Sequence, residues 1–127
     1  MEIDGIVTTG YGRGREFLSQ EFYSLKFKEK LDFKAYPGTL NIIVPDEYID
    51  EINNIKDSCK SKIKGEDNFG GVKYIKAILN NEINGAIVFP EKTSHDTNYL
   101  EFISKEKLRE KLNLKDNDKV NLKFKEW

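Results

Sequence analysis

VKYIKAILNNEINGAIVF, residues 72–89, is the stretch of sequence that decides the fold. Apolar β-branched and aromatic residues dominate it, and this composition favours strands. We expect one strand over residues 72–80 and a second, nearly continuous apolar strand over residues 83–89, broken only by a glycine. Asn81 and Glu82 lie between the two runs and predict a hairpin turn. The middle of the chain is therefore expected to form a β-hairpin.

Shorter runs of the same kind on both sides of the hairpin predict further strands, over residues 3–8, 39–44, 99–103 and 119–124. A helix over about residues 20–31 follows from Tyr23 and Phe27, which are spaced one helical turn apart and are expected in the core. A second helix is expected from Ser104, as its N-cap, to about residue 112. About six strands with two helices give a β-rich chain, and closure into a barrel is favoured because it leaves no exposed strand edges.

The connecting segments are predicted from turn residues and polarity. A Pro-Gly turn is expected at residues 35–38, and a short helical or irregular segment at residues 45–54. The lysine-rich residues 56–68 are expected to form a mobile loop. Residues 90–98 are predicted to form a long polar loop of the kind that often carries function. A turn at residues 114–118 leads into the last strand.

Length and charge bound the class of protein. The chain has 127 residues, which fits a single domain spanning residues 1–127. Its 21 Lys and Arg nearly balance 22 Asp and Glu, for a net charge of −1. A broad nucleic-acid-binding surface normally carries a basic excess, so no nucleic-acid partner is expected, although a small local basic site is compatible with this balance.

The single cysteine and the single histidine narrow the chemistry. Cys59 cannot form an internal disulfide, and without a second cysteine it gives no structural zinc site. With His95 as the only histidine, a His-rich metal centre or a Cys-His catalytic pair is not expected, and neither residue is given a role. We expect a cytoplasmic protein with no membrane partner, because no signal region and no apolar run of about 20 residues is present.

Glycine alternates with larger residues in Gly10-Tyr11-Gly12-Arg13-Gly14-Arg15-Glu16. Core packing does not require this pattern, whereas bare backbone N–H groups and arginine forks suit phosphate oxygens. The spacing fits neither the Rossmann fingerprint nor a P-loop. We therefore expect a phosphate-binding loop of another kind; the alternative is a flexible hairpin tip with solvated arginines.

Thr39 and Asn41 alternate on one predicted strand, so both side chains should lie on the same face. A hydroxyl and an amide oxygen beside phosphates would suit Mg²⁺, which takes only one or two protein ligands and keeps waters. The alternative is an ordinary strand start with a turn-capping asparagine. Sequence spacing alone also leaves two interpretations for each of two residues later in the chain. Glu101 is either part of a site or a solvated strand glutamate, and Arg109 either binds a ligand or forms a salt bridge with Glu106 or Glu110.

Taken together, the ordered blocks of sequence resemble the archaeal CTP-dependent riboflavin kinases. The blocks are residues 10–19, 36–41, 69–72, 85–90, 93–95 and 100–104, followed by Leu108 and Arg109. The resemblance spans nearly the whole chain. It implies a mainly β, six-stranded cradle-loop barrel with short helices. It also implies an enzyme that transfers the γ-phosphoryl group of CTP to the 5′-hydroxyl of riboflavin, giving FMN and CDP. We expect the protein to be a monomer.

The resemblance also implies roles for individual residues. The nucleotide site would comprise Gly10, Tyr11, Gly12, Arg13, Gly14, Arg15, Glu16, Glu106, Lys107, Leu108 and Arg109. Thr39 and Asn41 would hold Mg²⁺, and Thr93 and Glu101 would contact the flavin. Such a site depends mainly on positioning and charge neutralisation, here by Thr39, Asn41 and Arg15. It does not require a strong general base, and no residue is assigned that role.

The sequence departs from the usual family pattern at one position, and one alternative function is considered beside the kinase. Asn117 stands between two aspartates where the family usually has glycine, and asparagine tolerates the left-handed backbone of such a turn. The alternative function is a non-catalytic regulator on a related barrel, binding flavin or nucleotide, or DNA. The near-neutral charge argues against DNA, and the intact Thr39 and Asn41 argue against a kinase that has lost its activity.

Overall fold

The computed structural model describes residues 1–9, 21–36, 39–66, 70–90 and 98–125. The predicted glycine loop at residues 10–16, and Thr93 and His95, lie outside the described residues. The elements, in chain order, are β1 (Glu2–Thr8), α2 (Glu21–Leu31), β2 (Leu40–Ile43), the 3₁₀ helix η1 (Asp46–Tyr48), α3 (Ile49–Ser58), β3 (Lys62–Ile63), β4 (Val72–Leu79), β5 (Ile83–Pro90), β6 (Tyr99–Ile103), α4 (Leu108–Lys111) and β7 (Lys119–Phe124).

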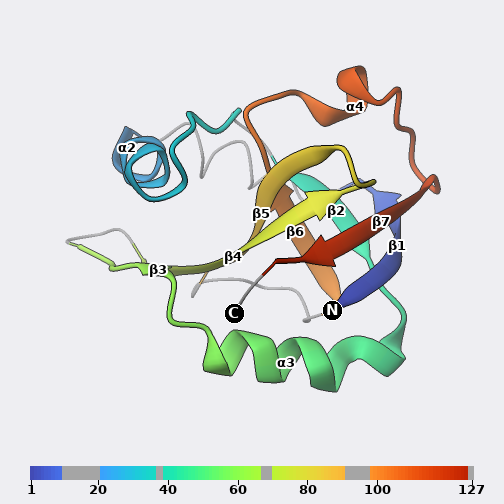
Figure 1. Ribbon diagram of the computed structural model, residues 1–127, viewed down its shortest axis with the longest axis horizontal. Helices are drawn as coiled ribbons and strands as arrows, with labels where there is room; N and C mark the ends of the chain where they lie inside the picture. The colour runs from blue at the N-terminus through green and yellow to red at the C-terminus, as the bar shows by residue number, and fades with distance from the viewer. Residues whose placement is uncertain (10–20, 37–38, 67–69, 91–97, 126–127) are drawn as a thin grey trace.

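Six antiparallel strands close into a barrel in the order β4-β5-β6-β2-β1-β7 (Figure 1). The seam is the pairing of β7 with β4, in which Ala77 lies opposite Phe124 and Leu79 opposite Leu122. The two-residue strand β3 adds to the other half of the β4 edge and stands outside the closed barrel. The predicted mainly β, six-stranded barrel is therefore confirmed.

The central hairpin turns one residue earlier than predicted. Asn80 and Asn81 have φ values of 51° and 55°, and the Glu82 N–H donates to the Leu79 carbonyl at 3.0 Å. Two consecutive left-handed residues make a type I′ turn, whose twist matches that of the flanking strands, and asparagine tolerates this backbone well. The turn is thus Asn80-Asn81 rather than Asn81-Glu82.

Buried side chains form two clusters, one on each side of the barrel wall. The larger cluster fills the barrel interior and includes Ile42, Leu79 and Phe102. The smaller one includes Tyr23 and Phe27 of α2 together with Tyr74 and Val88 of the barrel wall. The helix α2 lies beside the barrel (Figure 1). The predicted helix with aromatic residues in the core is confirmed. Among the described helices, none is both long and apolar enough to cross a bilayer.

Two predicted segments differ from the structure. Residues 49–58 form the regular helix α3, and the expected loop at residues 56–68 contains the end of this helix and β3. Conversely, α4 comprises only four residues, with Lys107 rather than Ser104 as its N-cap. The Ser104 hydroxyl accepts a hydrogen bond from the Glu106 N–H at 3.2 Å and donates to the Glu106 carbonyl at 2.9 Å. Ser104 therefore stabilises a local turn that delays the helix.

Candidate functional site

A row of polar residues crosses the outer face of three neighbouring strands. Thr8 on β1 lies opposite Asn41 on β2, and Asn41 lies opposite Glu101 on β6. Opposite residues on adjacent strands share a face of the sheet. Leu40 and Ile42, on either side of Asn41, are buried in the barrel interior, so the row faces outward.

Thr39 joins this row and completes a compact cluster. Its Oγ1 donates a hydrogen bond to Glu101 Oε1 at 3.2 Å, and Asn41 Nδ2 donates to the Thr39 carbonyl at 3.4 Å. Glu101 is only 9% exposed. It is therefore not a solvated strand glutamate, and the structure brings it together with both residues predicted to hold a metal.

The donor atoms of this cluster fit a hard cation. Because the amide nitrogen of Asn41 is bonded to a carbonyl, its Oδ1 is the atom left for a cation, and the Thr39 oxygen keeps its lone pairs while its proton points to Glu101. Hydroxyl, amide and carboxylate oxygens are ligands that Mg²⁺ accepts. Within the described residues, no group of three or more His, Cys, Asp or Glu could hold a metal. A Mg²⁺ ion bound by Thr39 and Asn41 would complete its coordination shell with water or ligand oxygens.

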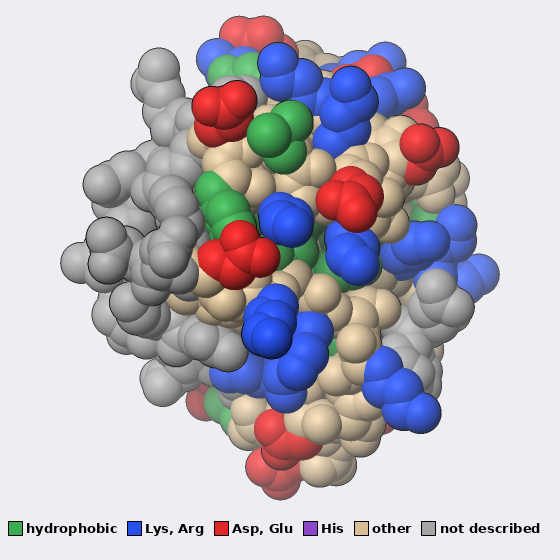
Figure 2. Space-filling view, turned by 90° about the vertical axis from the view of Figure 1, so that its left-hand side faces the viewer, with side chains coloured by type: hydrophobic (Ala, Val, Ile, Leu, Met, Phe, Trp, Pro, Cys, Tyr) green, Lys and Arg blue, Asp and Glu red, His purple; other side chains and the backbone are tan. Residues whose placement is uncertain are grey.

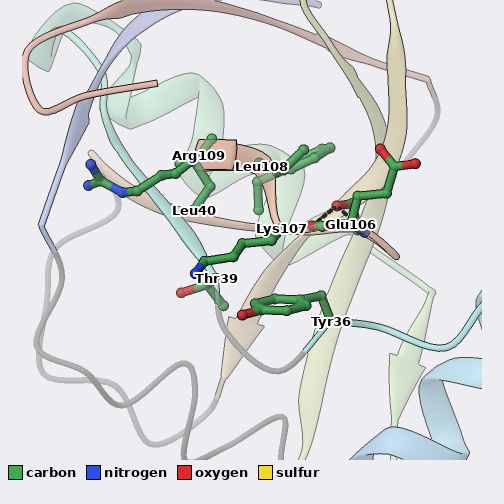
Figure 3. Close-up of a pocket in the computed structure, with 9 residues that line it drawn as sticks. Tyr36, Thr39, Leu40, Glu106, Lys107, Leu108 and Arg109 are labelled. Carbon is green, nitrogen blue, oxygen red and sulfur yellow. Dashed lines mark hydrogen bonds between the residues drawn. The ribbon is translucent and has the colours of Figure 1, made fainter. Parts of the chain in front are cut away.

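Beside the cluster is a pocket of about 130 Å³ that Thr39 also lines (Figure 3). Buried Leu40, Phe102 and Leu108 contribute its apolar part. Lys107 and Arg109 extend along its rim, and all four residues predicted from 106–109 line it. The pocket thus combines an apolar part with basic side chains, as a planar base carrying phosphates would require.

Tyr36 and Ser104 line the same pocket and were not predicted as site residues. The Tyr36 N–H donates to the Ser104 carbonyl at 2.8 Å, which fixes the two segments side by side. The Tyr36 ring lies below Lys107 and beside Thr39 (Figure 3). Both residues belong to sequence blocks that carry the family resemblance, and Tyr36 stands directly before Pro37 and Gly38.

Arg109 pairs with a residue that the sequence did not suggest. Its Nη2 lies 2.6 Å from Asp116 Oδ1 and also donates to the Thr8 carbonyl at 3.2 Å. The two glutamates expected as its partners bind lysines instead: Glu110 pairs with Lys107 and Glu106 with Lys111. The cause is the turn before β7, which brings Asp116 back beside α4.

Asp116 also binds the end of β1. Its Oδ2 accepts a hydrogen bond from Thr9 Oγ1 at 2.6 Å. The Thr9 hydrogen bond, followed by that from Arg109, holds the pKa of Asp116 below its ordinary value. The predicted turn survives the asparagine at its centre: Asn117 has φ 78°, and its N–H donates to the Val7 carbonyl at 2.8 Å.

Cys59 lies away from this arrangement. It is buried, and the single proton of its thiol is shared between the Tyr74 carbonyl, 3.1 Å from Sγ, and the Ser61 carbonyl, 3.3 Å from Sγ. No role was predicted for Cys59, and these contacts account for its burial.

Comparison with known proteins identifies the family. Residues 7–124 match the model of the CTP-dependent riboflavin kinase family, which is described as a domain of unknown function, DUF120. A riboflavin kinase of Methanobrevibacter smithii is 60% identical over 98% of this chain and 100% of its own length. Riboflavin kinases of Methanosphaera stadtmanae and Methanothermobacter thermautotrophicus are 39% and 43% identical, over 98% and 90% of this chain and 98% and 91% of their own lengths. The chain therefore belongs to the CTP-dependent riboflavin kinase family, and it is a kinase.

Proposed function

We propose that this protein transfers the γ-phosphoryl group of CTP to the 5′-hydroxyl of riboflavin, giving FMN and CDP. The observation that carries the proposal is the hydrogen bond between Thr39 and Glu101, beside the pocket lined by residues 106–109. Phosphoryl transfer requires donor and acceptor to be held in line and close together. Among the described residues, Thr39 and Asn41, assigned to the metal, lie next to Glu101, assigned to the flavin. The pocket lined by residues 106–109, assigned to the nucleotide, adjoins them, and this arrangement supports the proposed reaction.

The nucleotide would bind in the pocket. Leu40, Phe102 and Leu108 would contact the base, and the ammonium and guanidinium groups of Lys107 and Arg109 would attract phosphate oxygens. By resemblance, Gly10, Tyr11, Gly12, Arg13, Gly14, Arg15 and Glu16 would complete this site. The preference for CTP rests on the family, and the small volume of the pocket agrees with a single pyrimidine ring.

Mg²⁺ would be held by Thr39 Oγ1 and Asn41 Oδ1, and it would neutralise charge on the phosphates. The protein's own part is to keep these oxygens in place: the Thr39 hydroxyl through Glu101, and the Asn41 amide through the Thr39 carbonyl. Because both protein ligands are neutral, the cation keeps most of its charge for the phosphates. The protein without nucleotide should therefore bind Mg²⁺ weakly.

Glu101 and Thr93 would contact the flavin. A buried carboxylate next to the metal ligands can accept a hydrogen bond from the flavin's ribityl hydroxyls. Beside the polar row, Ile6, Ile43 and Tyr99 are paired across the same outer face, and both isoleucines are 40% exposed. An exposed apolar surface at this place would suit a flat aromatic ring.

The wider expectations belong to the same proposal. Residues 1–127 would act as one barrel domain and as a monomer in the cytoplasm, in agreement with the free, buried thiol of Cys59. The alternative is a DNA-binding regulator. Its DNA would bind on the side of the molecule that carries α2 and β3, where basic side chains gather (Figure 2). Acidic side chains are interspersed among them, so the kinase is favoured.

The test is direct. Purified protein is incubated with riboflavin, Mg²⁺ and either CTP or ATP, and FMN is separated from riboflavin by chromatography. We expect FMN with CTP, and little with ATP. Absence of FMN with every nucleotide would refute the kinase function, and a mobility shift with duplex DNA at physiological salt would favour the regulator.

A further inference from the structure

Asp116, in the turn between α4 and β7, connects two parts of the chain that border the proposed nucleotide site. One carboxylate oxygen binds Arg109 and the other binds Thr9, both at 2.6 Å. Arg109 lines the pocket, and Thr9 is the residue before Gly10. Because both oxygens are engaged, one side chain sets the spacing between the end of β1 and α4.

The end of β1 is held by further contacts. Arg109 Nη2 donates to the Thr8 carbonyl at 3.2 Å, and the Tyr99 hydroxyl donates to the Thr9 carbonyl at 3.1 Å. Side chains from α4, β6 and the turn before β7 therefore converge on two consecutive residues. Hydrogen bonds to ionised partners are the shortest and strongest of such contacts, so Asp116 dominates this arrangement.

The guanidinium of Arg109 still has N–H donors that can bind a ligand. Its two contacts use the same nitrogen, and the side chain is 39% exposed. Within the part of the chain that the structure describes, Nε and Nη1 remain for another acceptor. A guanidinium anchored at one nitrogen presents its other donors in a fixed plane, which suits phosphate oxygens.

We propose that Asp116 is a positioning residue for the phosphoryl donor: it orients Arg109 and anchors Thr9 without touching the nucleotide. This inference rests on the proposed function, because it takes CTP to bind beside residues 106–109. The family resemblance places Asp116 in a turn and gives it no part in binding. Since the side chains of Arg109 and Asp116 are 39% and 48% exposed, their pairing contributes little to stability, and its loss should affect nucleotide binding instead.

The test compares D116N with D118N. Both substitutions remove one negative charge from the same turn. Asp118 Oδ2 accepts a hydrogen bond from the Lys115 N–H at 2.8 Å, which the asparagine oxygen can also accept, and this makes D118N the matched control. The measurements are KM for CTP, KM for riboflavin, the Kd of CDP by calorimetry, and the melting temperature.

We expect D116N to raise the KM for CTP and the Kd of CDP by about tenfold, as for the loss of one charge-assisted hydrogen bond. The KM for riboflavin and the melting temperature should stay at the wild-type values, and D118N should match wild type throughout. Because Asp116 acts through Arg109, the effect of R109A combined with D116N should be smaller than the product of the single effects.

Three results would overturn the inference: wild-type CDP binding in D116N, equal losses in D116N and D118N, or single effects of D116N and R109A that multiply. The proposed function fails separately. If wild-type protein binds CDP and makes no FMN, the kinase proposal is lost, while CDP calorimetry on the same variants still decides the role of Asp116.

Discussion

Asn41 on β2 lies directly opposite Glu101 on β6, and Thr39, two residues before Asn41, donates a hydrogen bond to the same glutamate. Side chains from two strands far apart in sequence are therefore held together on one face of the barrel. A barrel wall is a rigid support, and this suits a site whose chemistry depends on the accurate position of oxygen atoms.

The proposed metal ligands give the first prediction. T39A and N41A should each lower kcat by about 100-fold, the size of loss seen when one electrostatic contact to a reacting group is removed, and should raise the Mg²⁺ concentration for half-maximal rate. Turnover at varied Mg²⁺ is the measurement. N54A, an exposed position on α3, is the control. Wild-type rates in both T39A and N41A would refute the metal assignment.

The second prediction concerns Glu101. E101Q keeps the shape of the side chain and an oxygen for Thr39, and removes the charge. We expect the KM for riboflavin to rise by about tenfold, because the hydrogen bond from the flavin loses its charged acceptor. The KM for CTP should change less, because the amide oxygen still accepts a hydrogen bond from the Thr39 hydroxyl. Steady-state kinetics with each substrate varied provides the check. A rise confined to CTP would place Glu101 on the nucleotide instead.

Gly85 gives a prediction about stability. A Cβ at this position would overlap the Ile103 carbonyl oxygen and the Phe102 ring, so the close approach of β6 leaves no room for a side chain at residue 85. G85A should lower the free energy of unfolding by about 3 kcal/mol or more, measured by urea denaturation. G5A should cost less, because the nearest atom there is a side-chain methyl of Ile42 rather than backbone. An equal or smaller loss for G85A would contradict this reasoning.

The packing of α2 on the barrel gives a fourth prediction. Phe27 is fully buried in the cluster under this helix, whereas Leu25 is 57% exposed. F27A should cost about 3–5 kcal/mol of unfolding free energy, and L25A less than about 0.5 kcal/mol. Denaturation of both variants tests this, and similar losses for the two would mean that α2 packs with a different face.

The last prediction is a titration. The folded pKa of Asp116 lies below the ordinary value of 3.8, chiefly through the hydrogen bond from Thr9. A carboxyl with a lowered pKa stabilises the folded state above its unfolded pKa, and this contribution is lost as the pH falls through the folded pKa. T9V should raise the pKa of Asp116 toward 3.8, observable by NMR of the carboxyl carbon. An unchanged pKa in T9V would assign the shift to Arg109.

Local sequence signals predicted the barrel well. β6 and β7 begin and end where their turn and polar residues indicated, and the hairpin of β4 and β5 was in error by one residue in the turn. The shortness of α4 was missed because Ser104 has the identity of an N-cap and uses its hydroxyl in a turn.

The site was predictable in part. Residues 106–109, which the resemblance assigns to the nucleotide, line one pocket together with Thr39. Their role in binding stays a prediction. The burial of Glu101 was not predictable, because it arises from the neighbouring strands, with Asn41 on one side and Val88 on the other. The salt bridge of Arg109 with Asp116 was likewise not predictable, because it forms only when the turn before β7 folds back beside α4. Contacts of this kind depend on tertiary structure and leave no local pattern.

The seam of the barrel has a consequence for synthesis. β7 follows the other six strands of the described residues, and it pairs with both β1 and β4. While the chain emerges from the ribosome, the earlier strands can therefore form only an open sheet whose two outermost members await residues 119–124. Exposed strand edges are prone to pair with other chains. Nascent chains stalled before β7 should thus associate with one another, and completion of the last strand is the step that ends this exposure.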